Sequence, residues 1–198
     1  IYELTNKMLT SYAESKFRSY DEMRKFLQEL AKLDNKQVWQ AFTAFIDREN
    51  IHMFLIKFLL GERISWKQYE ADVFSMMPPA EVIQWLRLKA DNKKFLRSFA
   101  EAMTIFIQED RLLQLSPLVI PFLIEFGDDS SVRSSVKKMT MFYSNSAVPV
   151  LEKELEVVSC YLDQEDKNVR LGAKETEQYL KNSIPLEQRN TDESSLLF

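Results

Sequence analysis

The strongest constraint on this chain is a segment that its sequence repeats. Residues 96–104 read LRSFAEAMT and return as VRSSVKKMT at residues 132–140. A looser third copy starts at Val169-Arg170. The apolar stretch before the first copy, residues 82–91, is echoed at residues 119–128. A repeat of roughly 35–40 residues with two apolar stretches is typical of arrays of paired helices.

The amino-acid composition also favours helices. Only 3 of the 198 residues are glycine, whereas sheet proteins use glycine in turns and bulges. The chain is 45% hydrophobic and 28% charged, which is ordinary for a folded soluble domain. The longest apolar run, residues 51–60, is too short for a membrane span and carries His52 and Lys57.

Apolar periodicity predicts helices along almost the whole chain. We expect a helix over residues 1–17, a second helix capped by Ser19 or Asp21, and a third that opens at Asp34. Further helices are expected over residues 51–60 and from Ser65 to the break at residues 76–79. The remaining helices form three predicted pairs, which are 79–90 with 92–108, 116–127 with 129–144, and 147–163 with 166–181.

The predicted organisation has three parts. Residues 1–78 form an N-terminal helical part, residues 79–182 hold the repeats, and residues 183–198 form a flexible acidic tail. The first two parts are expected to form one continuous domain. A short turn is expected over residues 110–115, and Pro121 is expected to kink the helix in which it lies.

The repeated segment resembles a HEAT repeat. The clearest copy, residues 121–144, has a proline in an apolar helix, an acidic turn at Asp128, and then Val132, Arg133 and Val136. The third copy matches through Asp163 or Asp166, Val169, Arg170 and Ala173, and the first through Asp91, Leu96 and Arg97. The resemblance implies an all-α fold, a right-handed α-solenoid of stacked antiparallel helix pairs. It also implies a concave face lined by the second helix of each pair.

Charge is unevenly distributed along the chain. Residues 1–100 contain 16 Lys and Arg against 13 Asp and Glu, whereas residues 101–198 contain 10 against 17. The acidic half would repel phosphate backbones, which disfavours general nucleic-acid binding. Within this acidic half, the outward positions of the second helices form a basic strip. We predict that it binds a partner through Lys137, Lys138, Met141, Lys174, Glu175 and Gln178.

Residues that could carry catalysis or bind a metal are few and isolated. His52 is the only histidine and has no ligand partners at metal-site spacing, so helix packing is the favoured role. Cys160 is the only cysteine, and we expect a structural thiol. Three scattered glycines exclude a glycine-rich phosphate loop. The sequence therefore predicts no cofactor and no metal.

The tryptophans and the repeated arginines are expected to be structural. The three tryptophans, Trp39, Trp66 and Trp85, lie in apolar stripes that predict a core position. The recurrence of Arg97, Arg133 and Arg170 favours a structural role over ligand binding.

The sequence favours a non-enzymatic scaffold or adaptor module that binds a helix or peptide of another protein. A cytoplasmic or nuclear location is expected, since a single cysteine suits a reducing compartment. Two alternatives stay open. The chain could be a helical enzyme whose site is assembled from scattered carboxylates such as Glu101 and Glu109, or a repeat protein that binds nucleic acid. The last residues, 192–197, also match an acidic dileucine pattern, which is common by chance.

Overall fold

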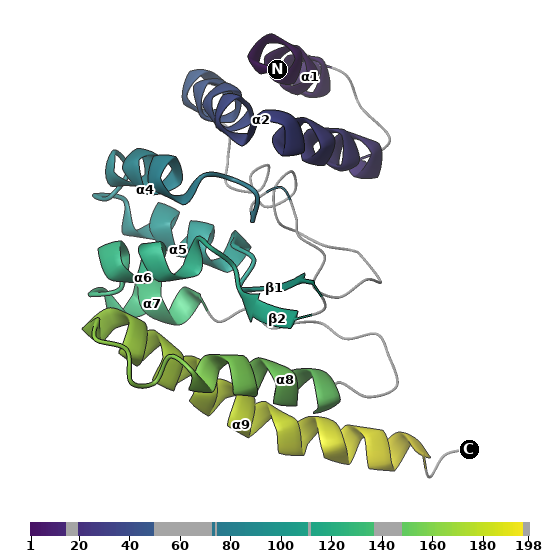
Figure 1. The fold of residues 1–198 in the computed structure, drawn as a ribbon, viewed down its shortest axis with the longest axis vertical. Coiled ribbons are helices and arrows are strands. Elements are labelled where there is room, and N and C mark those ends of the chain that lie inside the picture. Colours follow the sequence, from purple (N-terminus) through teal and green to yellow (C-terminus); the bar gives the residue numbers. More distant parts are fainter. Residues whose placement is uncertain (15–19, 50–72, 74, 111, 137–147, 196–198) are drawn as a thin grey trace. The chain divides into compact units, whose positions relative to one another are not determined.

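The computed structural model describes residues 1–14, 20–49, 73, 75–110, 112–136 and 148–195 (Figure 1). These residues are mostly helical and include one two-stranded sheet. The chain divides into two compact units. The N-terminal unit comprises residues 1–65 and 70–104, and the C-terminal unit comprises residues 66–69 and 105–198. The helical class is therefore confirmed, while the stacking of helix pairs into a solenoid stays a prediction.

The helices and strands follow one another along the chain. The N-terminal unit contains α1 (Tyr2–Glu14), α2 (Tyr20–Glu49), α4 (Pro79–Arg87) and α5 (Lys93–Ala102). The C-terminal unit contains β1 (Phe106–Glu109), β2 (Leu112–Leu115), α6 (Val119–Phe126), α7 (Ser130–Ser135), α8 (Val148–Ser159) and α9 (Lys167–Ser195).

In the N-terminal unit, α1 packs along α2, and α2 is interrupted at Asp34. Asp34 has an extended backbone (φ −159°, ψ 92°) inside the helix. Its Oδ1 accepts a hydrogen bond of 3.0 Å from the backbone N–H of Gln37. This bond satisfies a free N–H of the new first turn, which is what an N-cap does. The predicted opening of a new helix at Asp34 is confirmed.

Two of the predicted core tryptophans join α2 to α4. Trp39 and Trp85 are both buried, and their rings meet edge to face with centroids 5.5 Å apart. The indole Nε1–H of Trp85 donates to Asp47 Oδ2 at 3.2 Å, and the Lys89 ammonium donates to Asp47 Oδ1 at 2.7 Å. Asp47 thus satisfies the one polar group of a buried indole, as such groups require. The third tryptophan, Trp66, lies outside the described residues.

A β-hairpin replaces the end of a predicted helix. We expected a helix over residues 92–108, but α5 ends at Ala102, and Phe106–Glu109 pairs antiparallel with Leu112–Leu115. Glu109 pairs with Leu112, so the loop between them has two residues. Its first residue, Asp110, has a φ of 47°, the sign that two-residue hairpin turns need at this position. The expectation failed because no glycine marks the turn, and Asp tolerates the left-handed region instead.

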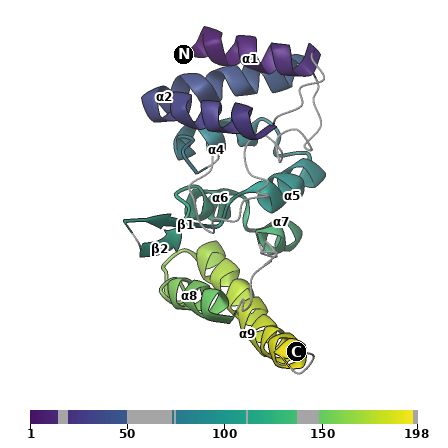
Figure 2. The ribbon, with the colours of Figure 1, turned by 90° about the vertical axis from the view of Figure 1, so that its right-hand side faces the viewer.

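The core of the C-terminal unit lies where the repeat pattern placed it. In Figures 1 and 2, α8 and α9 lie side by side, and the described structure packs them together. The apolar positions of the repeat that belong to α7 and α9 are buried, namely Val132, Val136, Val169 and Ala173. The corresponding apolar positions of the first copy, in the N-terminal unit, are buried too, namely Leu96, Phe99, Ala100 and Met103.

The second and third copies of the repeat begin with the same helix cap. Asp129 Oδ1 accepts from the backbone N–H of Ser131 and of Val132, at 2.9 and 3.2 Å. Asp166 Oδ1 accepts from the N–H of Asn168 and of Val169, at 2.8 and 3.0 Å. Each valine is therefore the third residue of its helix and is buried. The resemblance had placed the acid at Asp128, one residue before the side chain that forms the cap.

The arginines of these two copies also act alike. Arg133 donates to the carbonyl oxygen of Gly127, and Arg170 donates to that of Gln164, six residues back in each case. Both side chains thus reach the turn that precedes their own helix and satisfy carbonyls left free there. The predicted structural role is confirmed for these two residues.

The first copy departs from this geometry by one residue. Asn92 caps α5, and its side chain accepts from the N–H of Phe95 at 3.0 Å. Measured from the cap, Leu96 occupies the position of Arg133 and Arg170, and Arg97 comes one residue later. One residue rotates a side chain by about 100° on a helix. Leu96 is accordingly buried and Arg97 is exposed, so the predicted arginine equivalence is wrong for this copy.

Two helix features differ from the sequence prediction. Pro121 is the third residue of α6, where its missing N–H has no intrahelical partner to lose, so the lost hydrogen bond that would cause the predicted kink does not arise. We also expected the last helix to end at residue 181, before a loose tail over residues 183–198. Instead, α9 continues through Pro185 to Ser195. Ile184 is partly buried against a core cluster that includes Leu151 and Leu180, which extends the packed stripe beyond the predicted end.

Candidate functional site

Helix α9 presents one face to the core of the C-terminal unit and the opposite face to solvent. The buried face carries Val169, Ala173 and Leu180. Gly172 lies on this face too, where a Cβ atom would stand 2.9 Å from Leu123 Cδ1 on α6. The glycine therefore lets α9 approach α6 closely. Because this face is fixed against the core, the opposite face of α9 is fixed toward solvent.

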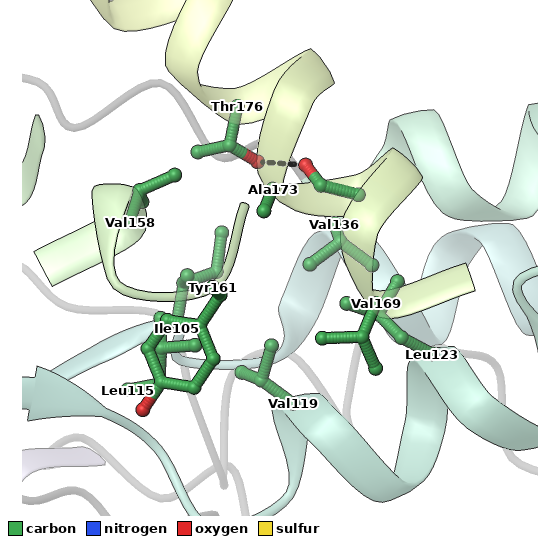
Figure 3. A pocket seen from close by; sticks show the side chains of 11 residues that line it. Ile105, Leu115, Val119, Leu123, Val136, Val158, Tyr161, Val169, Ala173 and Thr176 are labelled. Atoms are coloured by element: carbon green, nitrogen blue, oxygen red, sulfur yellow. Dashed lines mark hydrogen bonds between the residues drawn. The ribbon is translucent and has the colours of Figure 1, made fainter. Parts of the chain in front are cut away.

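The cavity of the C-terminal unit beneath α9 is too small for a substrate (Figure 3). It measures about 20 Å³, which is room for roughly one water molecule. Apart from the Tyr161 phenol and Thr176, whose hydroxyl donates to the Gly172 carbonyl at 2.9 Å, its lining is apolar. The lining comes from Ile105, Leu115, Val119, Leu123, Val136, Val158, Tyr161, Val169, Gly172, Ala173 and Thr176. We interpret it as a small packing gap.

The solvent face of α9 carries a row of basic side chains. Lys167, Lys174 and Lys181 are seven residues apart, so they lie on one face of the helix, and Arg189 continues the row. All four residues are exposed. The residues between them on this face are uncharged, namely Leu171, Gln178, Asn182 and Pro185. We call these eight residues the basic stripe.

Between Lys167 and Arg189, the carboxylates of α9 lie beside the stripe. Glu175 faces α7, where its Oε1 pairs with the Arg133 guanidinium at 2.9 Å. Glu177 pairs with Lys181 at 2.7 Å, one helical turn along. Lys181 is therefore partly neutralised by its own helix. Between Lys167 and Arg189, no carboxylate lies on the stripe itself.

The stripe gathers much of the basic charge of an acidic part of the chain. Of the other described basic residues in the C-terminal unit, Arg133 and Arg170 are held by the bonds to Glu175 and to turn carbonyls. The remaining one, Lys153, is exposed on α8. Because residues 101–198 contain more Asp and Glu than Lys and Arg, the stripe contrasts with its surroundings.

The predicted partner-binding residues fall into three groups. Lys174 and Gln178 are exposed on the stripe. Glu175 is half-buried in its ion pair with Arg133, so it is a structural neighbour of the stripe. The other three, Lys137, Lys138 and Met141, lie outside the described residues.

The sequence pattern predicted one of the four basic residues of the stripe, Lys174, and missed Lys167, Lys181 and Arg189. The prediction compared equivalent positions in different repeats, whereas these residues are related by their spacing within one helix. The seven-residue interval from Lys167 to Lys174 to Lys181 is the signal that could have found them.

The structure describes several of the residues that were considered for catalysis or metal binding. Glu101 is exposed on α5, and Glu109 accepts a hydrogen bond from Gln114 across the hairpin. Cys160 is exposed just after α8, although the predicted helix over residues 147–163 includes it. His52 lies outside the described residues. Among the residues that the structure describes, no three His, Cys, Asp or Glu side chains are grouped to hold a metal ion.

Two further observations bear on the kind of protein this is. Within the described ranges, no helix has both the length and the apolar character needed to cross a membrane. Comparison of the chain with models of protein families, with curated proteins and with solved structures returned no match.

Proposed function

We propose that this chain is a non-enzymatic protein-interaction module that binds an acidic helix or peptide of another protein along the basic stripe of α9. The observation that carries the proposal is the stripe itself, a row of exposed cations without a carboxylate in an acidic part of the chain. Complementary charge of this kind steers a partner and fixes its register.

We propose further that the C-terminal unit is related to HEAT repeats and that the protein works in the cytoplasm or nucleus. The relationship is supported by the equal cap, valine and arginine geometry at Asp129 and Asp166. The location is supported by the single cysteine, which suits a reducing compartment.

A charge-reversal experiment tests the proposed function. A photo-crosslinking residue at Gln178 would capture the partner in the native cell, and the purified partner would then be titrated by calorimetry. Lys167→Glu combined with Lys174→Glu should weaken binding by about tenfold or more, since two attractive contacts become repulsive. The melting temperature should stay close to that of the wild type, because both side chains are exposed.

Lys153→Glu on α8 is the matched control, an exposed lysine of the same unit that lies outside the stripe. It should leave the affinity nearly unchanged. If the double variant binds as tightly as the wild type, the stripe is not the binding surface.

A further inference from the structure

We infer that the segment bound by the stripe is an α-helix with carboxylates at seven-residue intervals, laid lengthwise along α9. This inference rests on the proposed function and names the conformation and charge pattern of the partner. It follows from the spacing of Lys167, Lys174 and Lys181 on one described face.

The geometry of two helices side by side gives this match. Seven residues of an α-helix rise about 10.5 Å, so the three lysines are spaced by that interval along α9. A second helix with Glu or Asp at i, i+7 and i+14 has the same rise and presents all three carboxylates on one face. Every carboxylate can then meet a lysine, because the drift of about 20° per seven residues on each helix is small enough for the long side chains to follow.

An extended peptide does not match the row. Side chains on one face of an extended chain recur about every 6.6–6.8 Å, so a carboxylate placed at Lys167 leaves none opposite Lys174. The next carboxylate that lies opposite a lysine comes near Lys181, about 21 Å along the helix from Lys167. An extended acidic peptide would therefore meet the outer two lysines and miss the middle one.

The residues between the lysines suit a close helical neighbour. Leu171, Gln178 and Pro185 are also seven residues apart and carry no charge. Helices pack with their axes 8–10 Å apart, which brings side chains between the charged positions into contact. These three residues can pack against small or polar side chains of the partner.

Nucleic acid and membrane surfaces fit the stripe less well. The acidic residues that surround the stripe would repel the phosphates of a DNA duplex, which carries charge along its whole length. A membrane-bound amphipathic helix needs large apolar residues beside its cations. The only large apolar residue on the stripe is Leu171, which is half-buried.

The test uses two synthetic acidic helices and the full-length chain. Both peptides have about 22 residues, the length of the stripe, and the same Ala-rich composition with four glutamates. In one peptide the glutamates are seven residues apart and share a face. In the other they are five residues apart and spread around the helix. Circular dichroism establishes equal helicity before binding is measured by fluorescence anisotropy.

The in-register peptide should bind at least about tenfold more tightly than the out-of-register peptide, since it alone engages three lysines together. Lys174→Glu should remove most of this preference, because it breaks the middle contact, whereas Lys153→Glu should not. A 22-base-pair DNA duplex and vesicles with anionic lipid serve as competing ligands and should bind more weakly than the in-register peptide.

The outcomes separate this inference from the proposed function. Equal affinity for the two peptides, or no binding of either, would overturn the helical register. Charge reversal could still weaken the captured partner in that case, and the proposed function would stand. Tighter binding of the duplex or of the vesicles would overturn the inference in favour of that ligand.

Discussion

At the scale of single residues, the distance from the helix cap decides what a repeated arginine does. Arg133 and Arg170 each stand four residues after the capping aspartate and bind the preceding turn. Arg97 stands five residues after Asn92 and is exposed. The sequence predicted three equivalent arginines because the three copies align at this residue. The direction of each side chain, however, depends on how many residues separate it from the helix cap.

This difference predicts unequal costs of removing the arginines. Arg133→Ala should destabilise the protein by about 2–3 kcal/mol, since it removes the guanidinium that binds both the Gly127 carbonyl and the Glu175 carboxylate. Arg97→Ala should change the unfolding free energy by less than about 0.5 kcal/mol, because its side chain is exposed. Urea unfolding of both variants measures the difference. If both substitutions lower the free energy of unfolding equally, the distance from the helix cap does not decide the role of the arginine.

A surface ion pair of the N-terminal unit gives a pH prediction. The Nζ atom of Lys36 lies 2.9 Å from Oε1 of Glu81. Their hydrogen bond lowers the pKa of Glu81 from its usual 4.5 and raises that of Lys36 from its usual 10.5. The stabilising contribution of Glu81 is therefore present above pH 4.5 and is lost as the pH falls through its lowered pKa.

Replacing Glu81 tests the sign of this dependence. Glu81→Gln should be slightly less stable than the wild type at pH 7, and the two should converge as the pH falls below 4.5. The contribution is small because both side chains are partly exposed. Thermal melting across this pH range measures it. A gap that persists at pH 2 would assign the effect to helix propensity or packing instead of charge.

At the scale of elements, the sequence predicted the buried faces of helices better than the residues at which helices end. The apolar positions of the repeat are buried, as Val132, Val136, Val169 and Ala173 show, since helical periodicity depends only on neighbours along the chain. The β-hairpin was missed because a turn at Asp110 needs a positive φ that no glycine announces. The end of α9 was missed because the apolar periodicity stops after Asn182 and the segment beyond it is polar and acidic.

The extended α9 predicts which part of the C-terminus is needed for stability. A chain that ends at Asn182 loses Ile184 and its packing on the core cluster. It should melt several degrees lower, because partial burial of one isoleucine contributes about 1–2 kcal/mol. A chain that ends at Arg189 keeps this contact and should melt like the full-length protein. If both truncations melt like the full chain, residues from 183 onward are dispensable, as the sequence had predicted.

At the scale of the whole molecule, the sequence predicted the helical class and left the arrangement open. Apolar spacing identifies which residues turn inward within each helix, but it does not say which helices share a core. The division between Thr104 and Ile105 falls inside what the repeat pattern treated as one helix. The basic stripe was found only in part, because its residues are related through one long helix whose length the pattern underestimated.

Two compact units predict two separable responses to damage in the core. Phe42 in the N-terminal unit and Phe122 in the C-terminal unit are both fully buried. Either Phe→Ala change should cost about 3–5 kcal/mol by removing packed side-chain volume. Since each unit has its own buried core, the opening of amide hydrogen bonds should increase mainly in the unit that carries the change.

Hydrogen exchange measured by mass spectrometry distinguishes the two responses. Phe42→Ala should speed exchange in α1, α2 and α4 and leave α8 and α9 protected, and Phe122→Ala should do the reverse. Leu33→Ala on α2 is a control, since that side chain is 74% exposed and its truncation should alter neither unit. If either core variant speeds exchange equally in both units, the molecule unfolds as one cooperative structure, because the loss of one core then removes the stability of the other.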